Sequence, residues 1–270
     1  MKIPCKNGPL ENGPLIMGIL NVTPDSFSDG GCWLKPRDAV NHALDLVEQG
    51  ANIIDIGAES TRPGSSPVSA EEEIARLEPV LKDLLPSIGV PVSIDTMKPS
   101  VAERCISLGA DIINDVWGLR SEGMVEVCAD GGASVIIMHM AGTPNTVHTT
   151  VMGPDYRENI RSFLVRQAQV AIDAGIPENK IIMDPGMGFG KTPAQNMDIL
   201  GHSSDYSCGF PVLMASSRKR FLKEYFSGLD RDEASAEAAF VSIRSGADIV
   251  RVHNVEYTVQ YLRRCMQEQL

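Results

Sequence analysis

Apolar residues recur along the chain in two alternating patterns. Short runs such as 53–56 and 134–138 are nearly continuous in Ile, Val and Met, and longer segments with regularly spaced apolar residues lie between such runs. A near-continuous apolar run is typical of a parallel strand covered on both faces, and an apolar residue every three to four positions is typical of an amphipathic helix. The pattern therefore predicts strands that alternate with helices.

Eight strand–helix units fit this pattern. We predict strands near 15–22, 51–58, 91–95, 111–116, 134–140, 180–184, 210–215 and 248–253. We predict helices near 37–49, 69–86, 99–108, 122–130, 154–174, 193–201, 232–245 and 255–269. Glycine recurs where a predicted helix returns to a strand, as at Gly50 and Gly109, and this placement is typical of helix C-terminal caps.

Eight such units in one chain indicate an α/β fold, a single (β/α)8 TIM barrel that forms one domain over residues 1–270. The length of 270 residues is close to the roughly 250 residues typical of these barrels. The alternative is a doubly wound open sheet, which usually carries a G-x-G-x-x-G turn after its first strand. Here the first predicted strand ends in Asn21-Val22-Thr23-Pro24-Asp25, which favours the barrel.

A short repeat precedes the barrel. The sequence Asn-Gly-Pro-Leu occurs at 7–10 and again at 12–15. It predicts either two short arms that meet at Glu11 or a short N-terminal hairpin. We place this segment as a lid on the floor of the barrel.

Polar residues gather where the predicted strands end. They are Asn21, Glu59, Thr61, Arg62, Asp95, Thr96, Asn114, Asp115, His139, Asp184, Arg218, Lys219, Arg251 and His253. The chemistry of such barrels lies at the carboxyl ends of the strands. Because an unpaired buried charge costs several kcal/mol, this many polar groups on one face indicate a ligand site.

The polar residues divide into two chemical groups. The first would match a flat heterocycle with both donors and acceptors and comprises Asp95, Asn114, Asp184 and Lys219. The second would suit an oxyanion, with bidentate arginines and an amide oxygen for a hard cation, and comprises Asn21, Thr61, Arg62, Arg251 and His253. The glycine-rich segment 184–191 fits backbone brought close to a flat ligand.

Other polar residues have ordinary explanations. Asp55, in the middle of a strand, is interpreted as a structural hydrogen-bonding residue, and Asp115 belongs either to a core network or to the site. His139, between two methionines, is interpreted as a satisfied core histidine. The other histidines that we assign to the surface are His42, His148 and His202.

Charge and cysteines limit the partners and the compartment. A net charge of −11 without a basic stripe argues against nucleic acid as the main partner. Six scattered cysteines without a C-x-x-C pair indicate reduced thiols and not a zinc site or a disulfide framework. We find no signal-like apolar segment and no apolar run near the roughly 18 residues of a membrane span. We expect a cytoplasmic protein without a membrane partner.

Eight segments together resemble the signatures of the dihydropteroate synthase family. In chain order they are Asn21-Val22-Thr23-Pro24-Asp25-Ser26-Phe27-Ser28-Asp29-Gly30-Gly31, Glu59-Ser60-Thr61-Arg62-Pro63-Gly64, Ser93-Ile94-Asp95-Thr96, Ile113-Asn114-Asp115-Val116, Met138-His139-Met140, Asp184 to Lys191, Ser217-Arg218-Lys219 and Arg251-Val252-His253. The resemblance runs from about residue 15 to 255 and keeps the family's order. It implies a pterin-binding (β/α)8 barrel, usually a homodimer.

The resemblance also implies a reaction. The family condenses 6-hydroxymethyl-7,8-dihydropterin diphosphate with p-aminobenzoate to give 7,8-dihydropteroate and pyrophosphate in folate biosynthesis, and sulfonamides bind at the p-aminobenzoate site. The implied cofactor is Mg2+. The implied enzyme is a transferase in which the diphosphate leaves the pterin C9 methylene and the arylamine attacks.

Site residues carry over by resemblance. Pterin contacts would come from Asp95, Asn114, Met138, Asp184, Gly188, Phe189 and Lys219. Diphosphate contacts would come from Asn21, Thr61, Arg62, Arg251 and His253, with Asn21 also the ligand of Mg2+. The p-aminobenzoate loops would contribute Phe27, Asp29, Pro63, Gly64 and Arg218. The residues expected to stabilise the reacting groups, and so to be catalytic, are Arg62, Lys219, Arg251 and His253.

The chain departs from the family's usual residues at Ala58, Trp117, Arg220 and Asn254. These departures remove no proposed catalytic group, but Arg220 and Asn254 leave sulfonamide sensitivity open. Two other functions are considered. A pterin-dependent methyltransferase would not need Arg62, and a catalytically silent pterin-binding paralogue would have degraded segments around Asn21 and Thr61.

Overall fold

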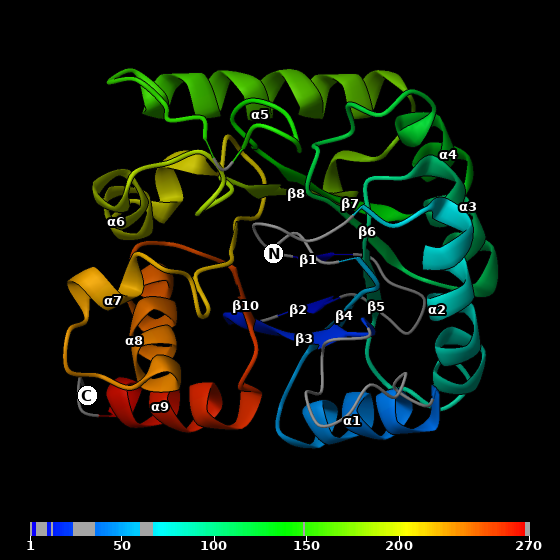
Figure 1. Ribbon diagram of the computed structural model, residues 1–270, viewed down its shortest axis with the longest axis horizontal. Helices are drawn as coiled ribbons and strands as arrows, with labels where there is room; N and C mark the ends of the chain where they lie inside the picture. Colours follow the sequence, from blue (N-terminus) through cyan, green and yellow to red (C-terminus); the bar gives the residue numbers. More distant parts are fainter. Residues whose placement is uncertain are drawn as a thin grey trace.

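Parallel strands form a ring at the centre of the molecule, and helices surround it (Figure 1). The computed structural model describes residues 2–3, 10–11, 13–23, 36–59, 67–147 and 149–267. The strands of the ring are β3 (Leu15–Asn21), β4 (Ile53–Gly57), β5 (Val92–Asp95), β6 (Ile112–Asp115), β7 (Ser134–Met138), β8 (Ile181–Asp184), β9 (Leu213–Met214) and β10 (Ile249–Val252). Each lies within a predicted strand range.

The strands are hydrogen-bonded in the order β8-β7-β6-β5-β4-β3-β10-β9. An isolated parallel bridge between Met183 and Val212 joins β8 to the start of β9 and closes the ring. At the same place the Met183 N–H donates to the Pro211 carbonyl oxygen at 2.8 Å. The predicted (β/α)8 barrel is therefore confirmed, and the open-sheet alternative is wrong.

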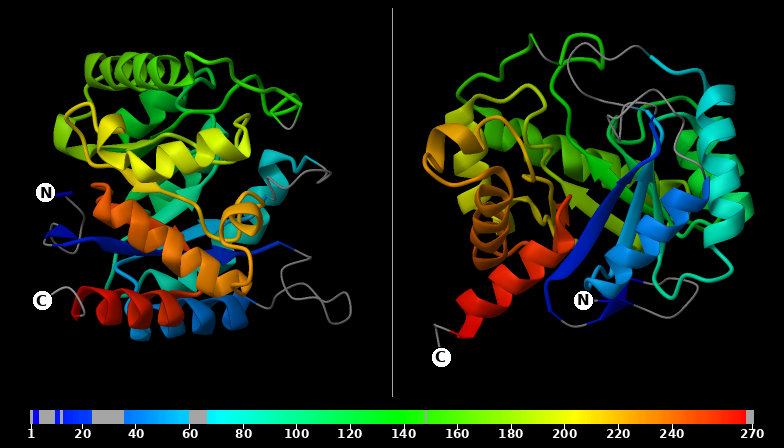
Figure 2. Two further views of the ribbon diagram at one scale, coloured as in Figure 1. Left: turned by 90° about the vertical axis from the view of Figure 1, so that its left-hand side faces the viewer. Right: turned by 60° about the horizontal axis from the view of Figure 1, so that its bottom comes forward.

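The helices surround the strands of the ring (Figure 1 and the right view of Figure 2). They are α1 (Pro36–Glu48), α2 (Ala70–Leu84), α3 (Pro99–Leu108), α4 (Met124–Asp130), α5 (Tyr156–Asp173), α6 (Pro193–Gly201), α7 (Leu222–Tyr225), α8 (Arg231–Arg244) and α9 (Val255–Gln267), with short 3-10 helices η1 (Glu178–Lys180) and η2 (Ser203–Tyr206). The eight long helices match the predicted ranges, whereas α7, η1 and η2 were not predicted. Within the described ranges, no helix combines the length and the apolarity that crossing a membrane requires.

A short hairpin of β1 (Lys2–Ile3) and β2 (Leu10–Glu11) precedes the ring. β1 lies against η1, which comes directly before β8, so the hairpin is at the amino end of the barrel, where we predicted it. The alternative of two arms that meet at Glu11 is wrong. The end of the first arm, Leu10, pairs with Ile3, upstream of the repeat, and the end of the second arm, Leu15, begins β3. Pro9 and Pro14 lack the N–H that a continuous ladder would need.

The lower half of the barrel interior is an apolar plug. It consists of Leu15, Met17, Ile53, Ile112, Ile136, Ile182, Leu213 and Ile249. Because side chains two positions apart on a strand share a face, the next inward positions toward the carboxyl ends form a layer above this plug. On five strands those positions are Asp55, Asn114, Met138, Asp184 and Arg251. The plug thus forms the floor of a mainly polar layer.

Candidate functional site

Arg251 lies at the centre of the polar layer and bridges two carboxylates. Its Nε donates to Asp55 Oδ2 at 2.6 Å, and its Nη2 donates to Asp95 Oδ2 at 2.7 Å. Asp55 is fully buried. Burial raises the pKa of Asp95, and the Arg251 charge opposes that rise. The three side chains connect β10, β4 and β5 across the barrel. Arg251 is thus the ion-pair partner of both carboxylates.

Asp55 also orients Asn114. Its Nδ2 donates to Asp55 Oδ2 at 3.2 Å, and no described residue donates to its buried Oδ1. A carboxylate can only accept hydrogen bonds, so Asp55 must face the amide nitrogen of Asn114. The amide oxygen is then left to accept an N–H from a ligand.

Asp184 ends β8 and is almost fully buried. Its Oδ1 accepts the Gly186 N–H at 2.7 Å. Burial raises the pKa of Asp184 to about 6, although the Gly186 N–H and the Lys219 charge lower it. A buried carboxylate whose pKa lies near neutrality is typical of a ligand-binding site.

Lys219 follows β9 and faces Asp184. Its Nζ lies 4.4 Å from the centroid of the Phe189 ring. A β-carbon on Gly188 would stand 3.0 Å from Lys219 Cδ and 3.3 Å from its Nζ, so the lysine side chain would have to shift by a few tenths of an ångström to admit one. Burial lowers the pKa of Lys219 to about 8, while Asp184 and Asp95 raise it. Arg251 lowers this pKa further, so two cations and two carboxylates lie close together here.

Asn21 ends β3 beside Asp95. A β-carbon on Gly57 would lie 3.9 Å from Asn21 Oδ1 and 3.8 Å from Asp95 Oδ2. Gly57 thus leaves open the space between these two oxygens. The described residues contain no cluster of three His, Cys, Asp or Glu side chains able to hold a metal. A cation at Asn21 would need water and ligand oxygens as its other ligands, which is the usual habit of Mg2+, so the residues present fit that ion.

His253 follows β10 and is held by Ser217. The Ser217 Oγ lies 3.0 Å from His253 Nδ1 and accepts the His253 backbone N–H at 3.2 Å. This contact ties the end of β10 to the segment after β9. It fixes the imidazole at the same end of the barrel as Lys219.

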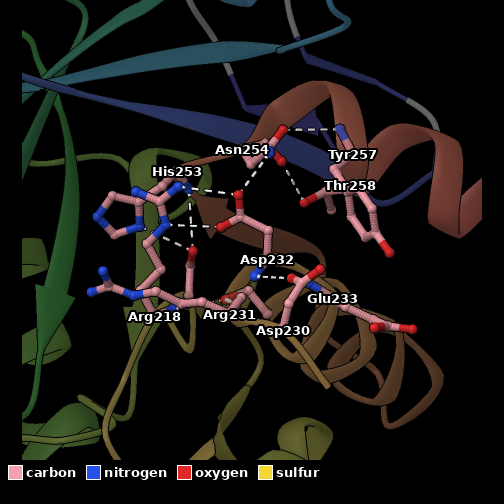
Figure 3. A network of polar contacts seen from close by, with 11 residues as sticks. Arg218, Asp230, Arg231, Asp232, Glu233, His253, Asn254, Tyr257 and Thr258 are labelled. Carbon is pink, nitrogen blue, oxygen red and sulfur yellow. Dashed lines mark hydrogen bonds and ion pairs between the residues drawn. The ribbon is translucent and has the colours of Figure 1, made fainter. Parts of the chain in front are cut away.

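Arg218 is held by Asp232 at the N-terminus of α8 (Figure 3). Its Nε and Nη2 donate to the two Asp232 carboxylate oxygens at 2.9 and 3.2 Å. Asn254 Nδ2 also donates to Asp232 Oδ2, at 2.8 Å. An aspartate at 254 would instead set a second carboxylate against Asp232. The departure from the family at Asn254 therefore has a physical reason.

The structure brings most described site residues together at one end of the barrel. Asp95, Asn114, Asp184 and Lys219 face each other as predicted, and Met138 and Phe189 belong to an adjacent apolar cluster. Arg251 lies with the carboxylates of the first group, while its role toward a diphosphate stays a prediction. The roles of Asn21, His253 and Arg218 also stay predictions. The predicted residues that lie outside the described residues are Phe27, Asp29, Thr61, Arg62, Pro63 and Gly64.

The residues with ordinary explanations are mostly accounted for. Asp55 has the structural role that we predicted, since it binds Arg251 and Asn114. Asp115 belongs to a core network, because its carboxylate accepts the Trp117 and Leu119 N–H groups at 2.7 and 2.8 Å. His139 is buried, as predicted. His202 is exposed and His42 half-buried, whereas His148 lies outside the described residues.

Sequence reasoning missed Gly57, Lys191 and Asp232. Lys191 had a signal, because it ends the glycine-rich segment that the sequence singled out. Gly57 and Asp232 had none. Their importance comes from the neighbours that the fold gives them, Asn21 and Arg218.

Comparisons with known proteins agree with this geometry. A family model described as "Pterin binding enzyme" matches residues 17–253. Dihydropteroate synthase from Bacillus subtilis is 42% identical over 90% of this chain and 84% of its own length. Dihydropteroate synthase from Escherichia coli is 39% identical over 93% of this chain and 90% of its own length.

Solved structures are similar over the whole fold. Xanthomonas albilineans dihydropteroate synthase with 4-aminobenzoic acid has a TM-score of 0.91 and 38% identity, covering 99% of this chain and 98% of its own. The Yersinia pestis enzyme with a sulfonamide drug has a TM-score of 0.92 and 36% identity, covering 100% and 99%. The Burkholderia cenocepacia enzyme complexed with 7,8-dihydropteroate has a TM-score of 0.88 and 37% identity, covering 100% and 98%.

Proposed function

Because the chain belongs to the dihydropteroate synthase family of pterin-binding enzymes, we propose that it condenses 6-hydroxymethyl-7,8-dihydropterin diphosphate with p-aminobenzoate. The products are 7,8-dihydropteroate and pyrophosphate, for folate biosynthesis. The observation that carries the proposal is the polar layer itself. Asp95, Asn114, Asp184 and Lys219 converge above an apolar floor with donors and acceptors suited to one flat heterocycle.

Recognition of the pterin follows from the charges and hydrogen-bonding groups of this layer. The Asp184 carboxylate accepts two N–H groups from the amino-pyrimidinone edge, and Lys219 donates to an acceptor on the ring. Asn114 Oδ1 accepts a third N–H, because Asp55 already occupies the Asn114 amide nitrogen. Phe189 and Met138 supply apolar contact with the ring.

The reaction exchanges one bond at C9 of the pterin. The arylamine nitrogen forms a bond to C9, the bond from C9 to the diphosphate oxygen breaks, and the proton that the amine loses passes to water. The charge that develops on the leaving diphosphate is stabilised by His253 and Arg251, with Thr61 and Arg62 completing the set. Asn21 Oδ1 would hold Mg2+, and the ion, when bound, would supply further positive charge to this diphosphate. An aniline-like amine needs no strong general base.

The second substrate would lie at the rim of the barrel. The family resemblance assigns p-aminobenzoate to the segments that carry Phe27, Asp29, Pro63 and Gly64, with Arg218 beside them. Both carboxylate oxygens of Asp232 accept hydrogen bonds from the Arg218 guanidinium. We infer that Arg218 shapes the rim and adds little free positive charge to it.

The test is a product assay with both substrates and Mg2+. Formation of 7,8-dihydropteroate and pyrophosphate would establish the synthase. Methyl transfer from a methylated pterin to a corrinoid protein would indicate the methyltransferase instead. Tight pterin binding without either turnover would indicate a silent paralogue.

Metal dependence gives a separate prediction. Removal of Mg2+ with EDTA should abolish turnover, because the leaving diphosphate loses its divalent counter-charge, and added Mg2+ should restore it. The measurement is the rate of dihydropteroate formation before and after chelation. Full activity without metal would exclude the role that we assign to Asn21.

We also propose that the enzyme is a homodimer, as is usual in the family. Tyr225 in α7 and Leu229 just after it are large apolar residues, 42% and 39% exposed. They offer apolar surface to a second copy. Light scattering during size-exclusion chromatography should give twice the chain mass, and the mass of one chain would contradict the proposal.

A cytoplasmic location is the last part of the proposal. The described cysteines Cys105, Cys128, Cys208 and Cys265 form no disulfide. Burial raises the pKa of Cys105 and of Cys128 to about 12, so both remain protonated thiols. Unpaired thiols suit a reducing compartment, and cell fractionation tests the location.

A further inference from the structure

Lys191 has an enclosed ammonium group that the proposed reaction does not use. The residue is 9% exposed and ends the glycine-rich segment 184–191, which follows β8. Its Nζ donates to the Gly186 carbonyl at 2.8 Å and to the Phe189 carbonyl at 3.2 Å, and it lies 3.1 Å from His139 Nδ1. A fourth acceptor, the His139 carbonyl oxygen, lies farther away at 3.5 Å. The three N–H donors of Lys191 thus have acceptors in two places, the glycine-rich segment and His139.

This arrangement fixes the state of His139. Burial lowers the pKa of Lys191 to about 7, while the Asp184 charge raises it. In its ammonium form Lys191 can only donate, so His139 Nδ1 then accepts and the ring proton is on Nε2. Burial and the Lys191 charge lower the pKa of His139 to about 2. His139 is therefore a neutral acceptor at physiological pH. Its edge-on contact with Phe163, at 5.1 Å between ring centroids, holds the ring from the other side.

The glycine-rich segment depends on contacts of this kind for its shape. Gly186, Gly188 and Gly190 all have positive φ, at 70°, 81° and 72°. Glycines have little conformational preference of their own, so the segment must be held by its neighbours. Asn196 of α6 accepts the Gly188 N–H at 2.7 Å on one side, and Lys191 binds the segment on the other.

The same segment forms part of the pterin site. It supplies the Gly186 N–H to Asp184 and places the Phe189 ring beside Lys219. We propose that Lys191 is a positioning residue for pterin recognition. Its ammonium group holds segment 185–190 against His139, so that Asp184 and Phe189 contact the pterin ring. This inference rests on the proposed function and adds a residue to it.

The test replaces Lys191 with methionine, which has similar length and no donor. Calorimetry with 6-hydroxymethylpterin should show at least a ten-fold higher Kd for Lys191→Met than for the wild type. In turnover, the KM for the pterin diphosphate should rise at least ten-fold while kcat changes less than three-fold. A merely destabilised protein would lose active molecules and lower kcat without this change in KM.

Lys180→Met is the matched control. Lys180 also donates to a glycine carbonyl, that of Gly132 at 2.6 Å, but it precedes β8 and lies at the amino end of the barrel. Its Kd for the pterin should stay within two-fold of the wild type. A ten-fold loss in this control as well would overturn the assignment to Lys191.

Two further measurements keep the proposal falsifiable. If Lys191→Met does not fold, Lys191→Gln retains two N–H donors and should show a smaller loss of pterin affinity. Nitrogen-15 NMR of the wild type should find the His139 proton on Nε2, and a proton on Nδ1 would overturn the geometry. Unchanged pterin affinity in the Lys191 variants would refute this inference alone, whereas a wild type that binds no pterin would refute the proposed function.

Discussion

Asp184 illustrates at the residue scale how binding and stability oppose each other. Its pKa is raised by burial to about 6, above the value of an unfolded aspartate. The stability that it contributes is complete below the unfolded pKa and is lost as pH rises through about 6, where the buried group becomes charged. Ligand binding has the opposite requirement, because only the carboxylate accepts two N–H groups.

Asp184→Asn should therefore separate the two properties. The asparagine oxygen can still accept the Gly186 N–H, so the turn is preserved. We expect the free variant to be about 1–3 kcal/mol more stable at pH 8, and its pterin Kd to be about ten- to hundred-fold higher. Denaturant unfolding and calorimetry between pH 5 and 8 would measure both. Equal pterin affinity in variant and wild type would contradict the role.

At the element scale, the segment between β8 and α6 shows which glycines are replaceable. A β-carbon on Gly186 would lie 1.8 Å from the His139 carbonyl oxygen. That oxygen belongs to the backbone, so no side-chain movement can relieve the clash. On Gly188 it would meet only the flexible Lys219 side chain. On Gly201, at the end of α6, it would meet nothing within 4 Å.

Three alanine variants should follow this order. Gly186→Ala should unfold the protein or destabilise it by more than about 3 kcal/mol. Gly188→Ala should cost about 1–2 kcal/mol of strain and weaken pterin binding, because Lys219 must move. Gly201→Ala should be neutral or slightly stabilising. Thermal melts and pterin titrations would rank them, and a stable Gly186→Ala would show that the segment is less constrained than described.

A largely buried ion network connects the segment after β4, helix α2 and the N-terminal cap of α3. Lys98 Nζ contacts Glu59 Oε2 at 2.5 Å and Glu73 Oε2 at 2.7 Å, and Glu73 is fully buried. Glu59 Oε1 also accepts the Val68 N–H at 3.0 Å. Burial raises the pKa of Glu73, while the Lys98 charge opposes that rise. One lysine therefore balances two carboxylates on different elements.

Removal of this lysine should be costly. Lys98→Met should lower the free energy of unfolding by about 3 kcal/mol, because the buried Glu73 charge loses its partner. Lys82→Met is the control, since Lys82 pairs with Glu78 on the exposed face of α2 and should change stability by less than about 1 kcal/mol. Urea unfolding of both variants compares them. Similar losses in the two variants would mean that burial adds nothing to the network.

At the scale of the whole molecule, the barrel could be predicted from the sequence, but the side-chain contacts within its site could not. Strand and helix ranges follow from local apolar periodicity, which each segment carries within itself. Arg251 and Asp55 are 196 positions apart, and no local pattern pairs them. The sequence therefore grouped Arg251 with the oxyanion residues, whereas the fold places its guanidinium between two carboxylates. Asp232 was likewise undetectable: it lies only 14 positions from Arg218, but the segment between β9 and α8 has no regular apolar period that would pair the two.

The closure of the ring between β8 and β9 makes a seam. Asp184 lies on one side of this seam and Lys219 on the other, and the described strands meet there through the bridge of Met183 and Val212. A pterin bound by both side chains would link the two sides of this seam. Ligand binding should then slow amide hydrogen exchange in β9 more than in β4, on the far side of the ring. The substrate would in that sense complete the barrel that binds it.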